Sequence, residues 1–333
     1  MMSQEAIEAL AAMLEGVSRT ELARRAERLS ALYRAGEASR VAVRDRLDAL
    51  AYAVARMPAT YAAVEAAARE ALRAGRLIPD REGIASILDL GAGPGAAALA
   101  VLSHLRESGE GAAVARVDLV EAHDAFRALA RALLAGLGQQ IAVVAADLRH
   151  PPATLPPADL VVASYVLVEL SNEEACALAE RAAGLARKAV LFVEPGTPAG
   201  FARIRTARDV LIKAGFSPLA PCPGPLPCPM TGGDWCHFSV RLARSRDHKF
   251  VKGAEAPFED ERFCYFAAAR ATTRPAAARV LATPSKGRGA IRAKLCTPDG
   301  VVFCDYRRSD KAAWKSARKL AWGDAIESGT ASG

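Results

Sequence analysis

Short apolar runs alternate with longer amphipathic stretches through the middle of the chain, from about residue 84 to residue 215. Each run has the length of a strand, and Leu160-Val161-Val162-Ala163 lacks any polar position, as in strands covered on both faces. Strands that alternate with helices in this way predict a doubly wound, mostly parallel α/β sheet. We predict strands at 85–90, 115–120, 140–145, 159–165 and 189–194, and a helix at about 202–215.

The segment before this sheet has a helical pattern. Ile7, Leu10 and Leu14 fall on one face of a first helix, and Ala dominates the composition up to about residue 80. Pro58 ends one helix and suits the first turn of the next, which we expect to end near Arg73. Residues 1–80 are therefore predicted to form a helical cap on the core.

The chain after residue 215 contains an irregular stretch, two further strands and then a second region with β-type alternation. Residues 217–235 are rich in Pro, Gly and Cys and predict no regular structure, before strands at about 237–243 and 262–269. Alternation returns over 277–306 around the turn Pro298-Asp299-Gly300, which predicts a small β-meander. A basic tail at 307–324 is expected to be a helix with Trp314 and Trp322. We expect a core at 81–272, with a Cys-rich insertion at 217–236, and a basic β-meander with its tail at 273–333.

The charge of the chain is unevenly distributed. The formal net charge is +7, but residues 1–200 hold a balance of −4 and residues 201–333 a balance of +11. A basic C-terminal part favours a polyanionic partner such as nucleic acid over a merely solvated surface. No apolar run has the length of a membrane span and no secretory signal is evident, so we expect a cytoplasmic protein without a membrane role. We also expect a monomer.

A glycine-rich loop follows the first predicted strand, in the order Asp89-Leu-Gly91-Ala-Gly93-Pro-Gly95. Glycines that leave a strand let a ligand approach the backbone, and the next helix offers free N–H groups. The pattern also fits a dinucleotide fingerprint, G-x-G-x-x-A. However, a carboxylate at Asp89 suits the ammonium of a methionine moiety and would lie badly beside a pyrophosphate. We therefore predict that the loop binds S-adenosylmethionine (SAM) through Asp89, Gly91, Gly93 and Gly95.

Polar residues at other strand ends complete the predicted cofactor pocket, since ligands of open parallel sheets bind there. Glu121 ends the second strand, where a carboxylate accepts hydrogen bonds from ribose hydroxyls, and Asp147 follows the third, near the expected adenine amino group. Ser164-Tyr165 would face the sulfonium. The loop after the fourth strand lacks the Asn/Asp-Pro-Pro-Tyr/Phe pattern of enzymes that methylate base amines, and neither Glu169 nor Glu194 is diagnostic. No catalytic residue is assigned.

Three of the seven cysteines lie close together, at Cys222, Cys228 and Cys236. In a reducing compartment this arrangement favours a metal site over disulfides. A zinc knuckle would have a tight Cys-x2-Cys, whereas an iron–sulfur cluster accepts wider spacing and needs a fourth thiolate. Cys296 beside its turn suits that role, because Cys264 and Cys304 lie in predicted strands. Cys176 is expected to be structural, and His237 a packed side chain.

These motifs together resemble the methyltransferase-like assembly factors of the mitochondrial small ribosomal subunit and their bacterial homologues. The similarity includes Arg56-Met-Pro-Ala-Thr-Tyr61, the glycine loop, the cysteine run ending Trp235-Cys236-His237-Phe238, Phe258-Glu-Asp-Glu261 and Ala321-Trp-Gly-Asp324. The resemblance implies a class I SAM-methyltransferase (Rossmann-like) fold and a [4Fe-4S] cluster on Cys222, Cys228, Cys236 and Cys296.

The same resemblance implies association with small-subunit ribosomal RNA during ribosome assembly. Two hypotheses follow: a SAM-dependent rRNA methyltransferase, or a non-catalytic assembly factor on a methyltransferase scaffold. A small-molecule methyltransferase with a structural zinc is a third.

Overall fold

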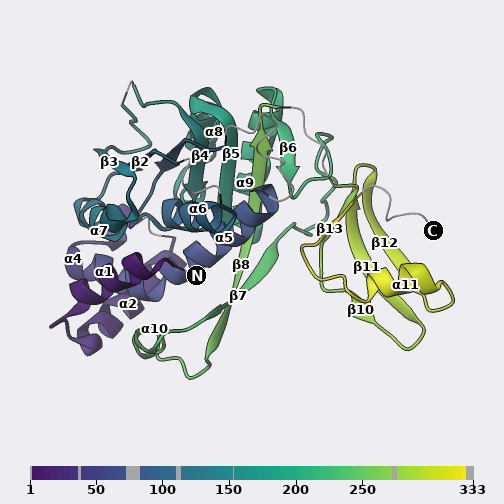
Figure 1. The fold of residues 1–333 in the computed structure, drawn as a ribbon, viewed down its shortest axis with the longest axis horizontal. Coiled ribbons are helices and arrows are strands. Elements are labelled where there is room, and N and C mark those ends of the chain that lie inside the picture. Colours follow the sequence, from purple (N-terminus) through teal and green to yellow (C-terminus); the bar gives the residue numbers. More distant parts are fainter. Residues whose placement is uncertain are drawn as a thin grey trace.

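The central sheet has the predicted architecture. The computed structural model describes residues 2–36, 39–72, 83–109, 114–152, 154–271 and 276–327. Within them eight strands form one sheet, in the order β3-β2-β1-β4-β5-β8-β6, with β7 paired to β8 (Figure 1). The strands are β1 (Ser86–Leu90), β2 (Arg116–Glu121), β3 (Gln140–Ala145), β4 (Ala158–Ser164), β5 (Ala186–Pro195), β6 (Ser217–Ala220), β7 (Phe238–Ala243) and β8 (Phe258–Ala269).

Strand direction places the chain in the class I SAM-methyltransferase fold. The first five strands are parallel, and β8 runs antiparallel between β5 and β6. Ser217–Ala220 corrects one prediction, since this stretch was expected to be irregular and instead pairs with β8. Its Pro218 is compatible with a strand because β6 lies at the sheet edge.

Neighbouring strand residues point into two different cores, which confirms that the sheet is covered on both faces. Ile87 joins the core on the side of α5 and α6, and Leu88 joins the core on the side of α8 and α9. The helices of the core region are α6 (Ala96–Glu107), α7 (Asp124–Leu134), α8 (Asn172–Leu185) and α9 (Pro198–Lys213), with short 3-10 turns η3 (Ala135–Leu137) and η4 (Leu167–Glu169).

The N-terminal segment is helical, as predicted, over its described residues. Its helices are α1 (Gln4–Leu14), α2 (Arg19–Arg34), α3 (Ser39–Ala42), α4 (Arg46–Ala55) and α5 (Met57–Leu72). The break before Pro58 lies where the sequence placed it, because Pro58 occupies the first turn of α5. The predicted boundary near residue 80 lies outside the described residues.

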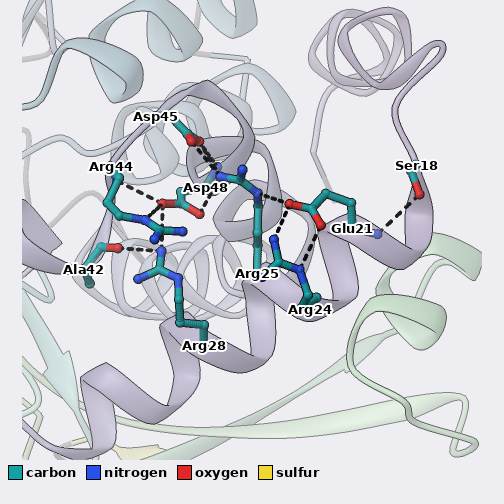
Figure 2. A network of polar contacts seen from close by, with 9 residues as sticks. All are labelled: Ser18, Glu21, Arg24, Arg25, Arg28, Ala42, Arg44, Asp45 and Asp48. Atoms are coloured by element: carbon teal, nitrogen blue, oxygen red, sulfur yellow. Dashed lines mark hydrogen bonds and ion pairs between the residues drawn. The ribbon is translucent and has the colours of Figure 1, made fainter.

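A buried carboxylate fixes the helices of this cap to one another. Asp48 is fully buried and receives hydrogen bonds from Arg25, Arg28 and Arg44 at 2.7–3.0 Å (Figure 2). A buried charge is costly unless it is paired and hydrogen-bonded, and here two arginines of α2 and a third before α4 supply the pairing. Asp48 therefore locks α2 and the turn before α4 into one unit.

An arm made of β7, α10 (Arg246–Val251) and β8 reaches from the sheet back to this cap (Figure 1). Its helix was not predicted. Arg19 at the start of α2 forms an ion pair of 2.5 Å with Asp247 in α10. The arm therefore joins the cap to residues more than 200 positions later in the chain.

The C-terminal part forms a second, five-stranded sheet, drawn in yellow in Figure 1. Its elements are β9 (Ala278–Val280), β10 (Ser285–Lys286), β11 (Ala290–Thr297), β12 (Gly300–Arg307), α11 (Lys311–Ala317) and β13 (Ala325–Ile326). The predicted turn joins β11 to β12, but β9 lies between β11 and β13, so the order is not that of a simple meander. The predicted tail helix is shorter than expected, and Trp322 lies beyond it.

Candidate functional site

A pocket lies at the carboxyl ends of β1, β2 and β4, where an open parallel sheet holds its ligand. It is lined by Gly91, Gly93, Glu121 and Asp147, together with Ser164 at the end of β4 and Tyr165 after it. Tyr52 and Thr60 of the cap also line it. The structure thus brings four of the six predicted cofactor residues to one cavity and adds two from the cap.

The glycine loop is shaped by its backbone. The N–H groups of Gly91 and Ala92 donate to the carbonyl of Val120 at 2.9 and 3.0 Å, which folds the loop over the end of β2. Gly93 has a φ of +54°, and a Cβ there would meet no protein atom within 4 Å. A side chain at Gly93 would therefore project into free space that a ligand could use.

Gly95 has a different role, because it does not line the pocket. It caps the start of α6 with a φ of +86°, and a Cβ would lie 2.7 Å from Cδ1 of Leu134 in α7. Glycine is required here for close helix packing. Gly95 therefore affects the pocket only indirectly, through the packing of α6 on α7.

Asp89 also lies beneath the loop and not on the pocket wall. It is fully buried, and its Oδ2 accepts a hydrogen bond of 3.1 Å from the backbone N–H of Ala98. Within the described structure its Oδ1 has no partner. Burial raises the pKa of Asp89 to about 7. An unpaired buried oxygen at this edge is the kind of acceptor that a ligand ammonium satisfies.

Glu121 joins the loop to the second strand. Its Oε2 accepts from Gly93 N–H at 2.8 Å and its Oε1 from His123 N–H at 2.7 Å. Burial raises the pKa of Glu121 above its usual range. Each oxygen keeps a further lone pair, so the carboxylate still has acceptor capacity for hydroxyl groups.

Asp147 is held by a neighbour that sequence reasoning missed. Arg149 donates to it through its backbone N–H at 3.0 Å and through its side chain, which lowers the pKa of Asp147. Arg149 also lines the pocket. Its position two residues after Asp147 was the available signal.

A second cavity contains all four predicted metal-ligand cysteines. Cys222, Cys228 and Cys236 line it from the loop after β6, and Cys296 lines it from β11. Cys296 lies beside its turn, as predicted, but it is the penultimate residue of strand β11 and not part of a loop. Cys264 and Cys304 lie in strands, as predicted, and Cys176 lies in α8.

The cysteine cavity is apolar and basic. Arg205, Arg208 and Arg279 are the charged residues of its lining, and no carboxylate belongs to that lining. Burial raises the pKa of Cys222, and burial together with neighbouring thiols raises the pKa of Cys296 to about 12. Among the described residues, no three or more His, Cys, Asp or Glu side chains are arranged to hold a metal ion.

His237 is a packed side chain, as expected. Its ring stacks on Trp235 at 5.0 Å and meets Trp322 edge-on at 4.9 Å. Trp322 donates from Nε1 to the carbonyl of His237 at 2.9 Å. These contacts connect the cysteine loop to the segment before β13.

The sequence profile of one protein family, described as mitochondrial small ribosomal subunit Rsm22, matches residues 46–327. This range includes the glycine loop, the arm and both parts of the cysteine cavity. The chain belongs to the Rsm22 family. The predicted resemblance to small-subunit methyltransferase-like proteins is thereby confirmed.

Solved methyltransferases also resemble this Rsm22 family chain. Magnesium protoporphyrin IX methyltransferase from Synechocystis PCC 6803, solved with bound SAM, is 16% identical, with 69% of this chain and 85% of that chain covered and a TM-score of 0.39. An O-methyltransferase family protein from Burkholderia thailandensis is 15% identical, with 68% and 61% covered and a TM-score of 0.42. None of the curated proteins compared with the chain matches it. Within the described residues, no helix is both long and apolar enough to cross a membrane.

Proposed function

We propose that this protein binds SAM and acts as a methyltransferase on small-subunit ribosomal RNA. The observation that supports the proposal most directly is the pocket at the sheet edge, where the glycine loop, Glu121 and Asp147 line one cavity. The family description supplies the ribosomal context. Methyl transfer from a sulfonium requires mainly alignment, and a pocket lined by the glycine loop and by Tyr52 and Thr60 of the cap could provide it.

SAM binding is tested with S-adenosylhomocysteine (SAH) by calorimetry. Glu121→Gln should weaken SAH binding by about tenfold, since replacing one charged acceptor by a neutral one costs about 1.4 kcal/mol. Glu107→Gln, at an exposed position of α6, is the matched control and should bind as the wild type. Wild-type protein that does not bind SAH would overturn the cofactor assignment.

We further propose that RNA is bound through the C-terminal sheet and its tail. The residues between 276 and 327 include nine exposed Lys or Arg and four exposed Asp or Glu side chains. Phosphate contacts should make the affinity fall steeply with salt. Filter binding to small-subunit RNA from 50 to 200 mM salt tests this, and an affinity that does not change with salt would contradict it.

We propose that the four cysteines hold the [4Fe-4S] cluster. Four thiols and no carboxylate on an apolar, arginine-lined cavity are a soft donor set, which suits iron–sulfur or zinc and not a hard cation. A single zinc ion holds its sulfurs around one point, whereas each thiolate of a cluster binds a different iron. The spacing along the chain favours the cluster, because Cys222, Cys228 and Cys236 lack the tight Cys-x2-Cys of a zinc knuckle.

Metal analysis of anaerobically isolated protein separates these cases. The cluster predicts about four irons per chain and a brown colour, with Cys296→Ser losing iron and Cys176→Ser retaining it. One zinc per chain would contradict the cluster. Because Cys296 belongs to the C-terminal sheet and its partners to the core loop, bound metal would also tie the RNA-binding part to the core.

A non-catalytic scaffold is the second candidate, and the absence of a base-specific sequence after β4 favours it. Asp89→Ala distinguishes the two. If ribosome assembly fails when Cys222 or Cys296 is replaced but tolerates Asp89→Ala, the enzymatic function is excluded.

A further inference from the structure

Tyr165 has an unusual backbone conformation at the edge of the cofactor pocket. Its φ of +57° is the only positive value at a non-glycine position in the part of the chain that the structure describes. The left-handed conformation costs an ordinary residue about 1–2 kcal/mol. Such strain persists where surrounding contacts impose it, and it is concentrated at functional sites.

The contacts that impose this conformation come from β5. The N–H of Tyr165 donates to the carbonyl of Val193 at 2.8 Å. The N–H groups of the next two residues donate at 3.1 and 2.8 Å to Oε1 of Glu194, which is fully buried. Glu194 thus fixes the loop after β4 and sets the direction of the Tyr165 side chain.

The Tyr165 hydroxyl is bonded to a carboxylate from a distant strand. It donates to Oε1 of Glu261 in β8 at 2.7 Å, and both residues are half-buried. Because the hydroxyl proton is committed to Glu261, the free lone pair of the phenol oxygen is an acceptor. A ligand beside it would have to offer an N–H or an O–H group.

We propose that Tyr165 and Glu261 form a proton relay for the methyl acceptor, and that this acceptor is an amine or hydroxyl group of the RNA. The inference rests on the proposed function. In the step, the acceptor atom forms a bond to the methyl carbon while the carbon–sulfur bond breaks and its electron pair stays on sulfur. The proton of the acceptor passes to the phenol oxygen of Tyr165 as the phenol proton passes to Glu261.

The charges around Glu261 suit a terminal base. Burial raises the pKa of Glu261, the Tyr165 hydroxyl and Arg56 lower it, Glu259 raises it and Lys252 lowers it. The Arg56 charge acts on both members of the pair, because it lowers the pKa of Tyr165 and of Glu261. A base whose pKa is raised toward the working pH accepts a proton more effectively in the transition state.

The test compares Tyr165→Phe and Glu261→Gln with the wild type. Both variants should lose about 10²–10⁴-fold in methyl incorporation from SAM into small-subunit RNA isolated from cells lacking the protein. Their SAH affinity should fall far less than the rate, because Tyr165→Phe keeps the ring on the pocket wall and the pair acts on the acceptor. Tyr61→Phe is the matched control, since Tyr61 is a buried tyrosine of α5 outside the pocket.

A pH profile separates the relay from a structural role. The wild-type rate should rise with pH through the raised pKa of Glu261, and the residual rate of Glu261→Gln should not. Nuclease digestion and analysis of the methylated nucleoside identify whether an amine or a hydroxyl was modified.

Each outcome decides a different question. Wild-type protein that fails to bind SAH overturns the proposed function itself. If the Tyr165→Phe variant binds SAH and methylates RNA as well as the wild type does, the relay alone is overturned. Wild-type protein that binds SAH but methylates no small-subunit RNA overturns both the proposed methyltransferase activity and the relay, and leaves the scaffold function.

Discussion

Gly93 and Gly95 lie two residues apart in the same loop, and the structure predicts opposite consequences for replacing them by alanine. Both have positive φ, so each substitution should cost about 1–2 kcal/mol of stability from the backbone alone. At Gly93 the added methyl meets no protein atom. At Gly95 it lies 2.7 Å from Leu134, and overpacking of this kind costs a further 1–3 kcal/mol, roughly.

The expected losses are therefore about 1–2 kcal/mol for Gly93→Ala and about 2–5 kcal/mol for Gly95→Ala. Urea unfolding of both variants and the wild type measures them. SAH affinity should show the reverse order. Gly93→Ala fills space on the pocket wall and should weaken SAH by about tenfold or more, about 1.4 kcal/mol, whereas Gly95→Ala should bind nearly as the wild type.

Two results would refute this reasoning. If Gly95→Ala is no less stable than Gly93→Ala, the contact with Leu134 does not limit the packing of α6 on α7. If Gly93→Ala binds SAH normally, the ligand does not occupy the cavity beside the loop.

Two further predictions concern buried carboxylates. For Asp89, the folded pKa of about 7 exceeds an unfolded value of about 3.9, so wild-type stability should fall as pH rises between these values. Asp89→Asn should therefore gain stability relative to the wild type between about pH 4 and pH 7, and a constant difference in urea unfolding over that range would contradict this. For Asp48, whose pKa is lowered to about 2, the stabilisation should be complete above about pH 4 and be lost toward pH 2. Asp48→Ala should cost about 3–5 kcal/mol because it leaves three arginines without their buried anion, while Asp45→Ala, which removes an exposed helix cap, should cost about 1 kcal/mol.

Much of the central sheet could be predicted because its signal is local. A parallel strand buried on both faces needs an unbroken apolar run, and β1 to β4 begin and end within one residue of the predicted positions. The fifth strand begins earlier than expected, at Ala186, because the charged residues Arg187 and Lys188 interrupt the apolar pattern by which a strand is recognised. The position of the pocket could also be predicted, because the carboxyl ends of parallel strands meet at one edge of the sheet.

Features that depend on distant partners could not be predicted. β6 exists because β8 supplies its hydrogen bonds, although its own sequence contains Pro218. The arm helix α10 is short and polar, and it is positioned by its contact with α2. Similarly, nothing in the local sequence of Glu261 indicates a bond to Tyr165, 96 residues earlier.

The place of β8 in the sheet constrains how a newly made chain acquires its shape. Since this late strand lies between β5 and β6, the open border of β5 has no neighbour until residues 258–269 have emerged from the ribosome that synthesises them. The lining of the cofactor pocket includes no residue of β8, but until β8 is in place Tyr165 would lack Glu261 as its hydrogen-bond partner. If the relay operates as proposed, the chain gains catalytic competence only once β8 has joined the sheet.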